Sequence, residues 1–183
     1  MARVYVITGG VKTGKSRWAV SYFADCSFVR VITAGSAIEE ETQKRIDTHM
    51  RLHPGMVQDW SVVSEPLCPS RAVETDRFFI IDSISTLVSN SIYEYCESPD
   101  EMSDDDEKKI STIVIEELAK TIDKVKQIDG NVILITTEAG FSCIPDKREA
   151  KAFRDILGAV NQRICGIADE VYLSVSGIQI KIK

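Results

Sequence analysis

The segment Gly9-Gly10-Val11-Lys12-Thr13-Gly14-Lys15-Ser16 constrains the fold of this 183-residue chain more than any other feature. It fits G-x-x-x-x-G-K-[ST], the P-loop pattern, which lies between a strand and a helix. Residues 4–8 are apolar and β-branched, as in a buried strand, and residues 15–25 are expected to form a helix. In such a loop, glycines let backbone N–H groups surround a phosphate, Lys15 contacts the β and γ oxygens, and Ser16 holds Mg²⁺. We therefore expect all eight residues to bind ATP or GTP.

A second apolar strand, residues 78–82, ends in a carboxylate, Asp82. This is the Walker B pattern, in which the acid supports Mg²⁺. Many strands end in Asp before a turn, so the pattern alone is weak. Downstream of a P-loop it favours Asp82 as a metal-supporting residue beside Ser16.

Strand-like and helix-like segments alternate along the chain, which predicts an α/β fold with a mostly parallel sheet. Further strands are expected over 28–33, 131–136, 170–175 and 178–182, and further helices over 38–53, 84–95, 104–127 and 147–167. The last two strands surround Ser176-Gly177, which predicts a C-terminal antiparallel hairpin. No internal repeat or low-complexity linker interrupts the pattern. Residues 1–183 are therefore expected to form a single nucleotide-binding catalytic domain.

Composition excludes several classes of protein. The formal net charge is −6, and eight acidic residues lie between Glu94 and Glu107, so the acidity is local and predicts a solvated connection over 98–103 that tolerates shortening. A nucleic-acid-binding protein needs a basic patch, which is not evident. No apolar run approaches the length of a membrane span, and no secretory signal is evident, so the cytoplasm is expected. The five cysteines form no C-x-x-C pair and are expected to be reduced and mostly buried.

The two histidines, His49 and His53, are four residues apart on one expected helix and so share a face. A metal pair is one interpretation, although the HExxH glutamate and a third ligand are missing. A nucleophile is another, because neutral imidazole can attack phosphorus. From the spacing alone, a helix C-terminus that favours cationic side chains explains the pair best.

Several motifs occur together in an order that resembles one enzyme family. They begin with the P-loop, Arg45-Ile46-x-x-His49, Trp60, Glu65-Pro66 and Asp82 with Ser89-Asn90. They continue with Glu138-x-Gly140, Pro145, Phe153-Arg154-Asp155, Gly158, Asn161-Gln162, Ala168-Asp169 and the Ser176-Gly177 hairpin ending in Lys181. Together they cover nearly the whole chain and resemble the bifunctional adenosylcobinamide kinase/adenosylcobinamide-phosphate guanylyltransferase family.

The resemblance implies a RecA-like P-loop NTPase fold, a homotrimer and a corrinoid substrate. It implies that a nucleoside triphosphate phosphorylates adenosylcobinamide, and that GMP from GTP passes through an enzyme histidine to adenosylcobinamide phosphate. His49 matches that histidine. The family's nucleotide contacts fall on Thr33, Ala34, Gly35, Arg51, Leu52, His53, Glu65 and Asp82.

Two alternatives remain beside this interpretation. One is a member with a single activity, for example a kinase only. The other is a regulatory nucleotide switch, which needs a guanine-reading N-K-x-D segment and a D-x-x-G segment. No N-K-x-D segment is evident, and Asp82-Ser83-Ile84-Ser85 does not fit D-x-x-G.

Overall fold

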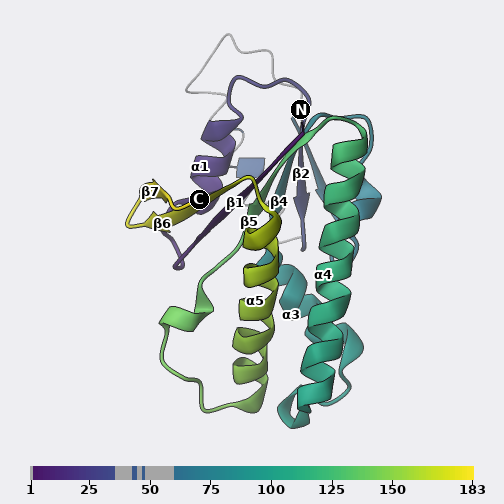
Figure 1. The fold of residues 1–183 in the computed structure, drawn as a ribbon, viewed down its shortest axis with the longest axis vertical. Coiled ribbons are helices and arrows are strands. Elements are labelled where there is room, and N and C mark those ends of the chain that lie inside the picture. Colours follow the sequence, from purple (N-terminus) through teal and green to yellow (C-terminus); the bar gives the residue numbers. More distant parts are fainter. Residues whose placement is uncertain (1, 36–42, 45–46, 48–59) are drawn as a thin grey trace.

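The computed structural model describes residues 2–35, 43–44, 47 and 60–183. Within these residues, seven strands form one sheet in the order β3-β2-β4-β5-β1-β6-β7 (Figure 1). The strands are β1 (Arg3–Gly9), β2 (Val29–Thr33), β3 (Trp60–Ser64), β4 (Phe78–Asp82), β5 (Asn131–Ile135), β6 (Glu170–Val175) and β7 (Ile178–Lys181). All neighbours pair in parallel except β6 and β7, which form an antiparallel hairpin.

The sheet lies between two layers of helices because its strands are buried on both faces. On β1, Val4 and Val6 belong to one core, whereas Tyr5 and Ile7 belong to the other. The first core packs against α3 (Ile84–Tyr95), α4 (Asp104–Gln127) and α5 (Arg148–Ile167), and the second packs against α1 (Lys15–Tyr22). Continuous apolar strands of this kind are typical of parallel sheets covered on both faces.

Strand order sets the geometry of the site. Strand β5 separates β1, which leads into the P-loop, from β4, which ends at Asp82. Ile7 is level with Ile135, and Ile135 is level with Asp82. The P-loop and Asp82 therefore start from the same edge of the sheet, at the carboxyl ends of its parallel strands, where α/β proteins bind ligands.

Most expected elements are confirmed, and three segments differ. Strand β3 has no counterpart among the expected elements, and it pairs with β2 at the edge of the sheet. Helix α1 ends at Tyr22 rather than at residue 25. The helix expected over 38–53 lies outside the described residues apart from 43–44 and 47. The cysteines are less buried than expected, since four are half-buried and Cys143 is exposed, and none forms a disulfide.

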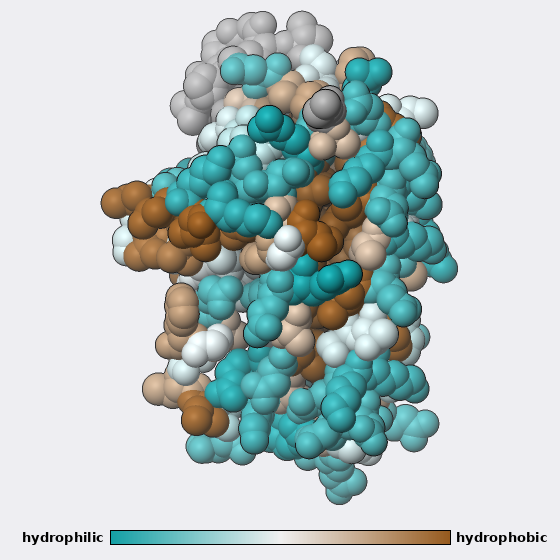
Figure 2. All heavy atoms as spheres, in the orientation of Figure 1, coloured by the Kyte–Doolittle hydropathy of each residue, from teal (hydrophilic) through white to brown (hydrophobic). Residues whose placement is uncertain are grey.

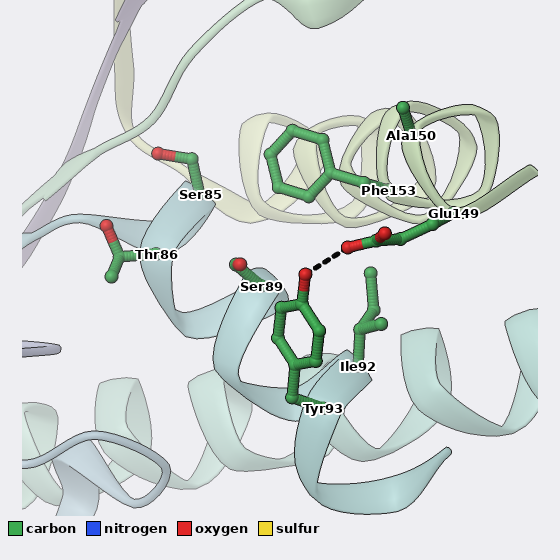
Figure 3. A pocket seen from close by; sticks show the side chains of 8 residues that line it. All are labelled: Ser85, Thr86, Ser89, Ile92, Tyr93, Glu149, Ala150 and Phe153. Atoms are coloured by element: carbon green, nitrogen blue, oxygen red, sulfur yellow. Dashed lines mark hydrogen bonds between the residues drawn. The ribbon is translucent and has the colours of Figure 1, made fainter. Parts of the chain in front are cut away.

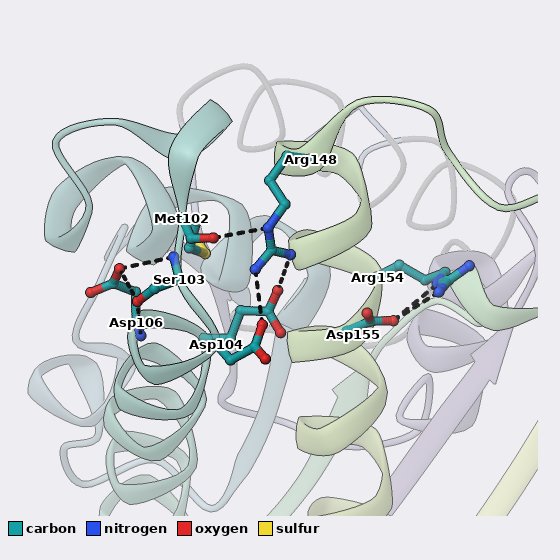
Figure 4. Close-up of polar contacts among 8 residues, drawn as sticks. Met102, Ser103, Asp104, Asp106, Arg148, Arg154 and Asp155 are labelled. Atoms are coloured by element: carbon teal, nitrogen blue, oxygen red, sulfur yellow. Dashed lines mark hydrogen bonds and ion pairs between the residues drawn. The ribbon is translucent and has the colours of Figure 1, made fainter.

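The acidic connection over 98–103 is exposed at residues 98, 100, 101 and 103, as expected, but Met102 anchors it to the core, and its tolerance of shortening stays a prediction. The side chain of Met102 is only 3% exposed and belongs to the larger core. Ser103 begins α4 with a capping box, in which its hydroxyl accepts from the Asp106 amide and the Asp106 carboxylate accepts from the Ser103 amide (Figure 4). Arg148 of α5 donates to the Met102 carbonyl at 2.8 Å and pairs with Glu107. These contacts join the start of α4 to the start of α5.

Met102→Ala is expected to lower the free energy of unfolding by about 2–5 kcal/mol, because it leaves a cavity in the core. Chemical denaturation of the two proteins measures the difference. Asp100→Ala changes an exposed side chain two residues earlier in the chain and is the matched control. It should change the free energy of unfolding by less than about 0.5 kcal/mol. Equal stability of Met102→Ala and the wild type would contradict a packed role for this segment.

Candidate active site

The P-loop joins β1 to α1 and has the backbone of a phosphate-binding loop. Lys12 has φ 58° and Gly14 has φ 95°, two left-handed residues that turn the chain before the helix begins at Lys15. The Thr13 hydroxyl donates to the Gly10 carbonyl at 2.9 Å and braces the turn. Val11 and Lys12 are exposed. Backbone amides at this loop and at the start of α1 can therefore surround an anion.

Lys15 is held inside the loop. Its side chain is 9% exposed, and its ammonium group donates to the carbonyls of Gly9 at 3.0 Å and Gly10 at 2.7 Å. Burial lowers the pKa of Lys15, and the charge of Asp82 opposes this shift. Lys15 thus lies between the loop and Asp82, where its charge can act on phosphate oxygens.

The C-terminal hairpin of β6 and β7 contacts the P-loop through hydrogen bonds. The Ser174 hydroxyl donates to the Thr13 carbonyl at 2.8 Å, and the Gly177 amide donates to the same carbonyl at 3.1 Å. Gly9 has φ 140°, and a Cβ added there would lie 2.2 Å from the Ser174 carbonyl oxygen. The loop can approach β6 this closely only because residue 9 is glycine.

Gly9→Ala is therefore expected to push the loop away from β6, weakening nucleotide binding and costing about 1–3 kcal/mol of stability. Titration with nucleotide and thermal unfolding measure the two effects. Gly158→Ala is the matched control, because its Cβ would meet nothing within 4 Å and helix α5 favours alanine over glycine. Wild-type nucleotide affinity in Gly9→Ala would show that the close approach does not shape the loop.

Ser16 and Asp82 offer the oxygen chemistry expected of a magnesium site. Asp82 is 6% exposed at the end of β4, and it lies close enough to Lys15 for its charge to raise the pKa of that lysine. Ser16 lies in the first turn of α1. Among the described residues, no group of three His, Cys, Asp or Glu side chains could hold a metal by itself. Mg²⁺ usually takes one or two protein oxygens and completes its coordination with phosphate and water, so a hydroxyl and a carboxylate are the donor types that such a site uses.

The structure places Thr33, Ala34, Gly35 and Glu65 at the same sheet edge as Asp82. The Ala34 amide donates to the Asp82 carbonyl, and the Glu65 amide donates to the Thr33 carbonyl at 2.8 Å. The side-chain amide of Asn90, on α3, donates to the carbonyls of Ala34 at 2.7 Å and Pro66 at 3.0 Å. Asn90 thus fastens the two segments together, a role that its sequence motif gave no means of predicting.

A buried polar network holds the other side of the P-loop. The Glu138 carboxylate, just beyond β5, accepts from Thr8 at 3.0 Å and from the side-chain amide of Asn161 at 3.3 Å. Asn161 also accepts from Thr136 at 2.6 Å and donates to the Thr137 carbonyl. The network ties β1, β5 and α5 together at the base of the loop. Glu138 and Asn161 both belong to motifs that the sequence analysis identified. Their shared role in this hydrogen-bond network could not be predicted, because it depends on contacts between residues far apart in the chain.

The structure therefore brings together Gly9 to Ser16, Thr33 to Gly35, Glu65 and Asp82. Four other expected residues, His49, Arg51, Leu52 and His53, lie outside the described part of the chain. Their roles stay predictions.

Known proteins match this chain along nearly all of its length. The family described as "Cobinamide kinase / cobinamide phosphate guanyltransferase" matches residues 5–182. The "Bifunctional adenosylcobalamin biosynthesis protein CobU" of Escherichia coli (strain K12) is 31% identical over 97% of this chain and 98% of its own. The "Bifunctional adenosylcobalamin biosynthesis protein CobP" of Pseudomonas aeruginosa is 23% identical over 97% of this chain and 96% of its own.

A solved structure confirms the fold. An ATPase of the type III secretion system of pathogenic bacteria superposes with a TM-score of 0.55 at 11% identity, over 93% of this chain and 50% of that chain. This likeness concerns the fold alone, and it agrees with the expected α/β P-loop architecture. The mostly parallel sheet and the C-terminal hairpin are confirmed by the strand pairing of this chain itself. Because the family match extends over residues 5–182, this chain belongs to the cobinamide kinase / cobinamide phosphate guanyltransferase family.

Proposed function

We propose that this chain phosphorylates adenosylcobinamide and then transfers GMP from GTP to the product, giving GDP-cobinamide. The observation that carries the proposal is a complete P-loop, with Lys15 buried beside Asp82, in a chain that belongs to this family along its length. Residues 1–183 act as one catalytic domain in this proposal.

In the kinase reaction, the alcohol of the aminopropanol side chain attacks the γ-phosphorus of ATP or GTP. A new bond forms between this oxygen and phosphorus, the bond to the bridging oxygen breaks, and the nucleoside diphosphate leaves. Lys15 and the loop amides stabilise the negative charge that spreads over the transferring group. Ser16 and Asp82 would hold Mg²⁺, which would neutralise part of the negative charge on the phosphate groups.

In the guanylyl reaction, the imidazole of His49 attacks the α-phosphorus of GTP and releases pyrophosphate. A phosphate oxygen of adenosylcobinamide phosphate then attacks the same phosphorus and frees the histidine. The support for His49 is the Arg45-Ile46-x-x-His49 motif within the matched family region. Thr33 to Gly35, Arg51 to His53 and Glu65 are proposed to contact the nucleotide.

The kinase half is tested by incubating the protein with adenosylcobinamide and GTP or ATP labelled at the γ-phosphate. Label should appear in the corrinoid, and its dependence on each nucleotide gives the donor preference. Protein that hydrolyses nucleotide without labelling the corrinoid would refute the proposed kinase.

We further propose that the protein is a homotrimer of the cytoplasm. Among the described residues, no helix has both the length and the apolarity needed to cross a membrane. Apolar side chains gather on the C-terminal hairpin at the left of Figure 2, where Val175, Ile178, Ile180 and Ile182 are 48%, 67%, 51% and 59% exposed. A face of this kind is suited to burial against other copies of the chain.

Ile180→Asp is expected to shift the protein from trimer to monomer, because it places an unpaired charge in that contact. Light scattering reports the molar mass. Ile144→Asp, an equally drastic change at an exposed site away from the hairpin, should leave the trimer intact. A trimer that survives Ile180→Asp would place the interface elsewhere.

A further inference from the structure

A pocket of about 460 Å³ lies between α3 and the first turns of α5, and no sequence motif had assigned it a ligand. Figure 3 shows the side chains that α3 and α5 contribute to its walls. Its lining residues are Ser85, Thr86, Ser89, Ile92, Tyr93, Glu149, Ala150 and Phe153.

The walls combine neutral hydrogen-bonding groups with apolar surface. Three hydroxyl groups, from Ser85, Thr86 and Ser89, follow one another along α3. The Phe153 ring lies across from them on α5 and supplies apolar surface. Among the described residues that line the pocket there is no Lys, Arg or His, the side chains that bind phosphate. The described lining therefore suits a mostly apolar group that carries neutral hydrogen-bonding substituents such as amides.

One carboxylate gives the pocket its charge. The Tyr93 hydroxyl donates to Glu149 across the space between α3 and α5, and this hydrogen bond raises the pKa of Tyr93 (Figure 3). The tyrosine hydrogen bond sets the position of Glu149, and a carboxylate at this place favours a cationic ligand over an anionic one.

The pocket begins next to the nucleotide site. Asp82 is followed by Ser83, the N-cap of α3, whose hydroxyl lies 2.8 Å from the Ser85 hydroxyl. Ser85 in turn lines the pocket. A ligand seated there has one end close to the carboxyl end of β4, where the phosphate groups are expected to lie.

We propose that this α3–α5 pocket binds the amide-bearing rim of the corrinoid acceptor and directs its alcohol side chain toward the γ-phosphate. This assignment rests on the proposed function. A corrin carries neutral acetamide and propionamide groups around an apolar macrocycle, and the cobalt–adenosyl centre leaves it with a net positive charge. The hydroxyls of α3 match the amides, the Phe153 ring matches the macrocycle, and the Glu149 carboxylate matches the positive charge. The volume holds a rim rather than a whole corrinoid, whose remainder stays outside the open pocket.

Direct binding of adenosylcobinamide, measured by equilibrium dialysis without nucleotide, tests the assignment. Ser89→Leu fills the pocket and should raise the dissociation constant at least about 10-fold. The KM for adenosylcobinamide should rise in parallel, while the KM for nucleotide stays within about 2-fold of wild type. Ser98→Leu, at an exposed serine outside the pocket, is the matched control and should bind as the wild type does.

A second variant keeps the test sound if Ser89→Leu fails to fold. Tyr93 is 63% exposed, so Tyr93→Phe is expected to fold normally, and loss of its hydroxyl should weaken corrinoid binding about 5-fold. Tyr95→Phe, two residues along the helix and outside the lining, is its control.

The outcomes separate this inference from the proposed function. Wild-type corrinoid affinity in both Tyr93→Phe and a folded Ser89→Leu would overturn the pocket assignment alone. A wild-type protein that binds nucleotide but no corrinoid would overturn the proposed function and the assignment with it.

Discussion

Lys15→Ala is expected to reduce kcat/KM for corrinoid phosphorylation by about 10²–10³-fold, the effect of removing one group that stabilises transition-state charge. The reason is its position, since the ammonium group is enclosed by the loop and lies close to Asp82. Guanylylation should fall as well, because it also requires a bound triphosphate. Steady-state kinetics with adenosylcobinamide and labelled nucleotide measure both losses.

Lys120→Ala provides the matched control, since Lys120 is an exposed lysine on α4. It should keep wild-type kinetics. Lys15→Met separates folding from chemistry, because it keeps the length of the side chain and removes the charge. A folded Lys15→Met protein with near wild-type turnover would contradict the role assigned to the P-loop.

His49→Ala is expected to abolish covalent attachment of GMP and formation of GDP-cobinamide, with kinase activity largely intact. The two reactions differ in this respect because the substrate alcohol itself attacks the γ-phosphorus, whereas guanylyl transfer passes through the protein. A phosphoramidate requires neutral imidazole. In the wild type, GMP loading should therefore fall as the pH drops below the histidine pKa, about 6.5 when unperturbed.

His53→Ala is the natural comparison, since it removes the other histidine, four residues away. It should keep some guanylylation if His53 only orients GTP. Label that persists on His49→Ala and disappears from His53→Ala would move the nucleophile to residue 53.

Short sequence patterns correctly predicted the elements whose structure depends on residues close together in the chain. The P-loop glycines need left-handed or close-approach backbone, and the apolar run before Asp82 forms β4 as expected. Helix α4 carries its own capping box and an apolar stripe, and its observed bounds equal the expected ones. Strand β3 was missed because it is a short edge strand of half-buried residues without strict alternation.

Features that depend on distant contacts could not be predicted in this way. Met102 lies in an acidic stretch, and only its position against the core shows that it is buried. The bond from Ser174 to the Thr13 carbonyl joins residues 161 positions apart, so the hairpin's support of the loop has no local signature. The alternating pattern of β7 predicted a half-exposed strand. In the structure its isoleucines, Ile178 and Ile180, are exposed. The reason is that the hairpin projects beyond the helices (Figure 1).

A chase with GTP labelled at the α-phosphate tests the bifunctional account most directly. The protein is incubated with the labelled GTP, freed of unbound nucleotide and then given adenosylcobinamide phosphate. We expect acid-labile, base-stable label on the protein at His49, which moves to GDP-cobinamide when the corrinoid is added. Wild-type protein that phosphorylates adenosylcobinamide but never acquires this label would contradict the account and leave a kinase alone.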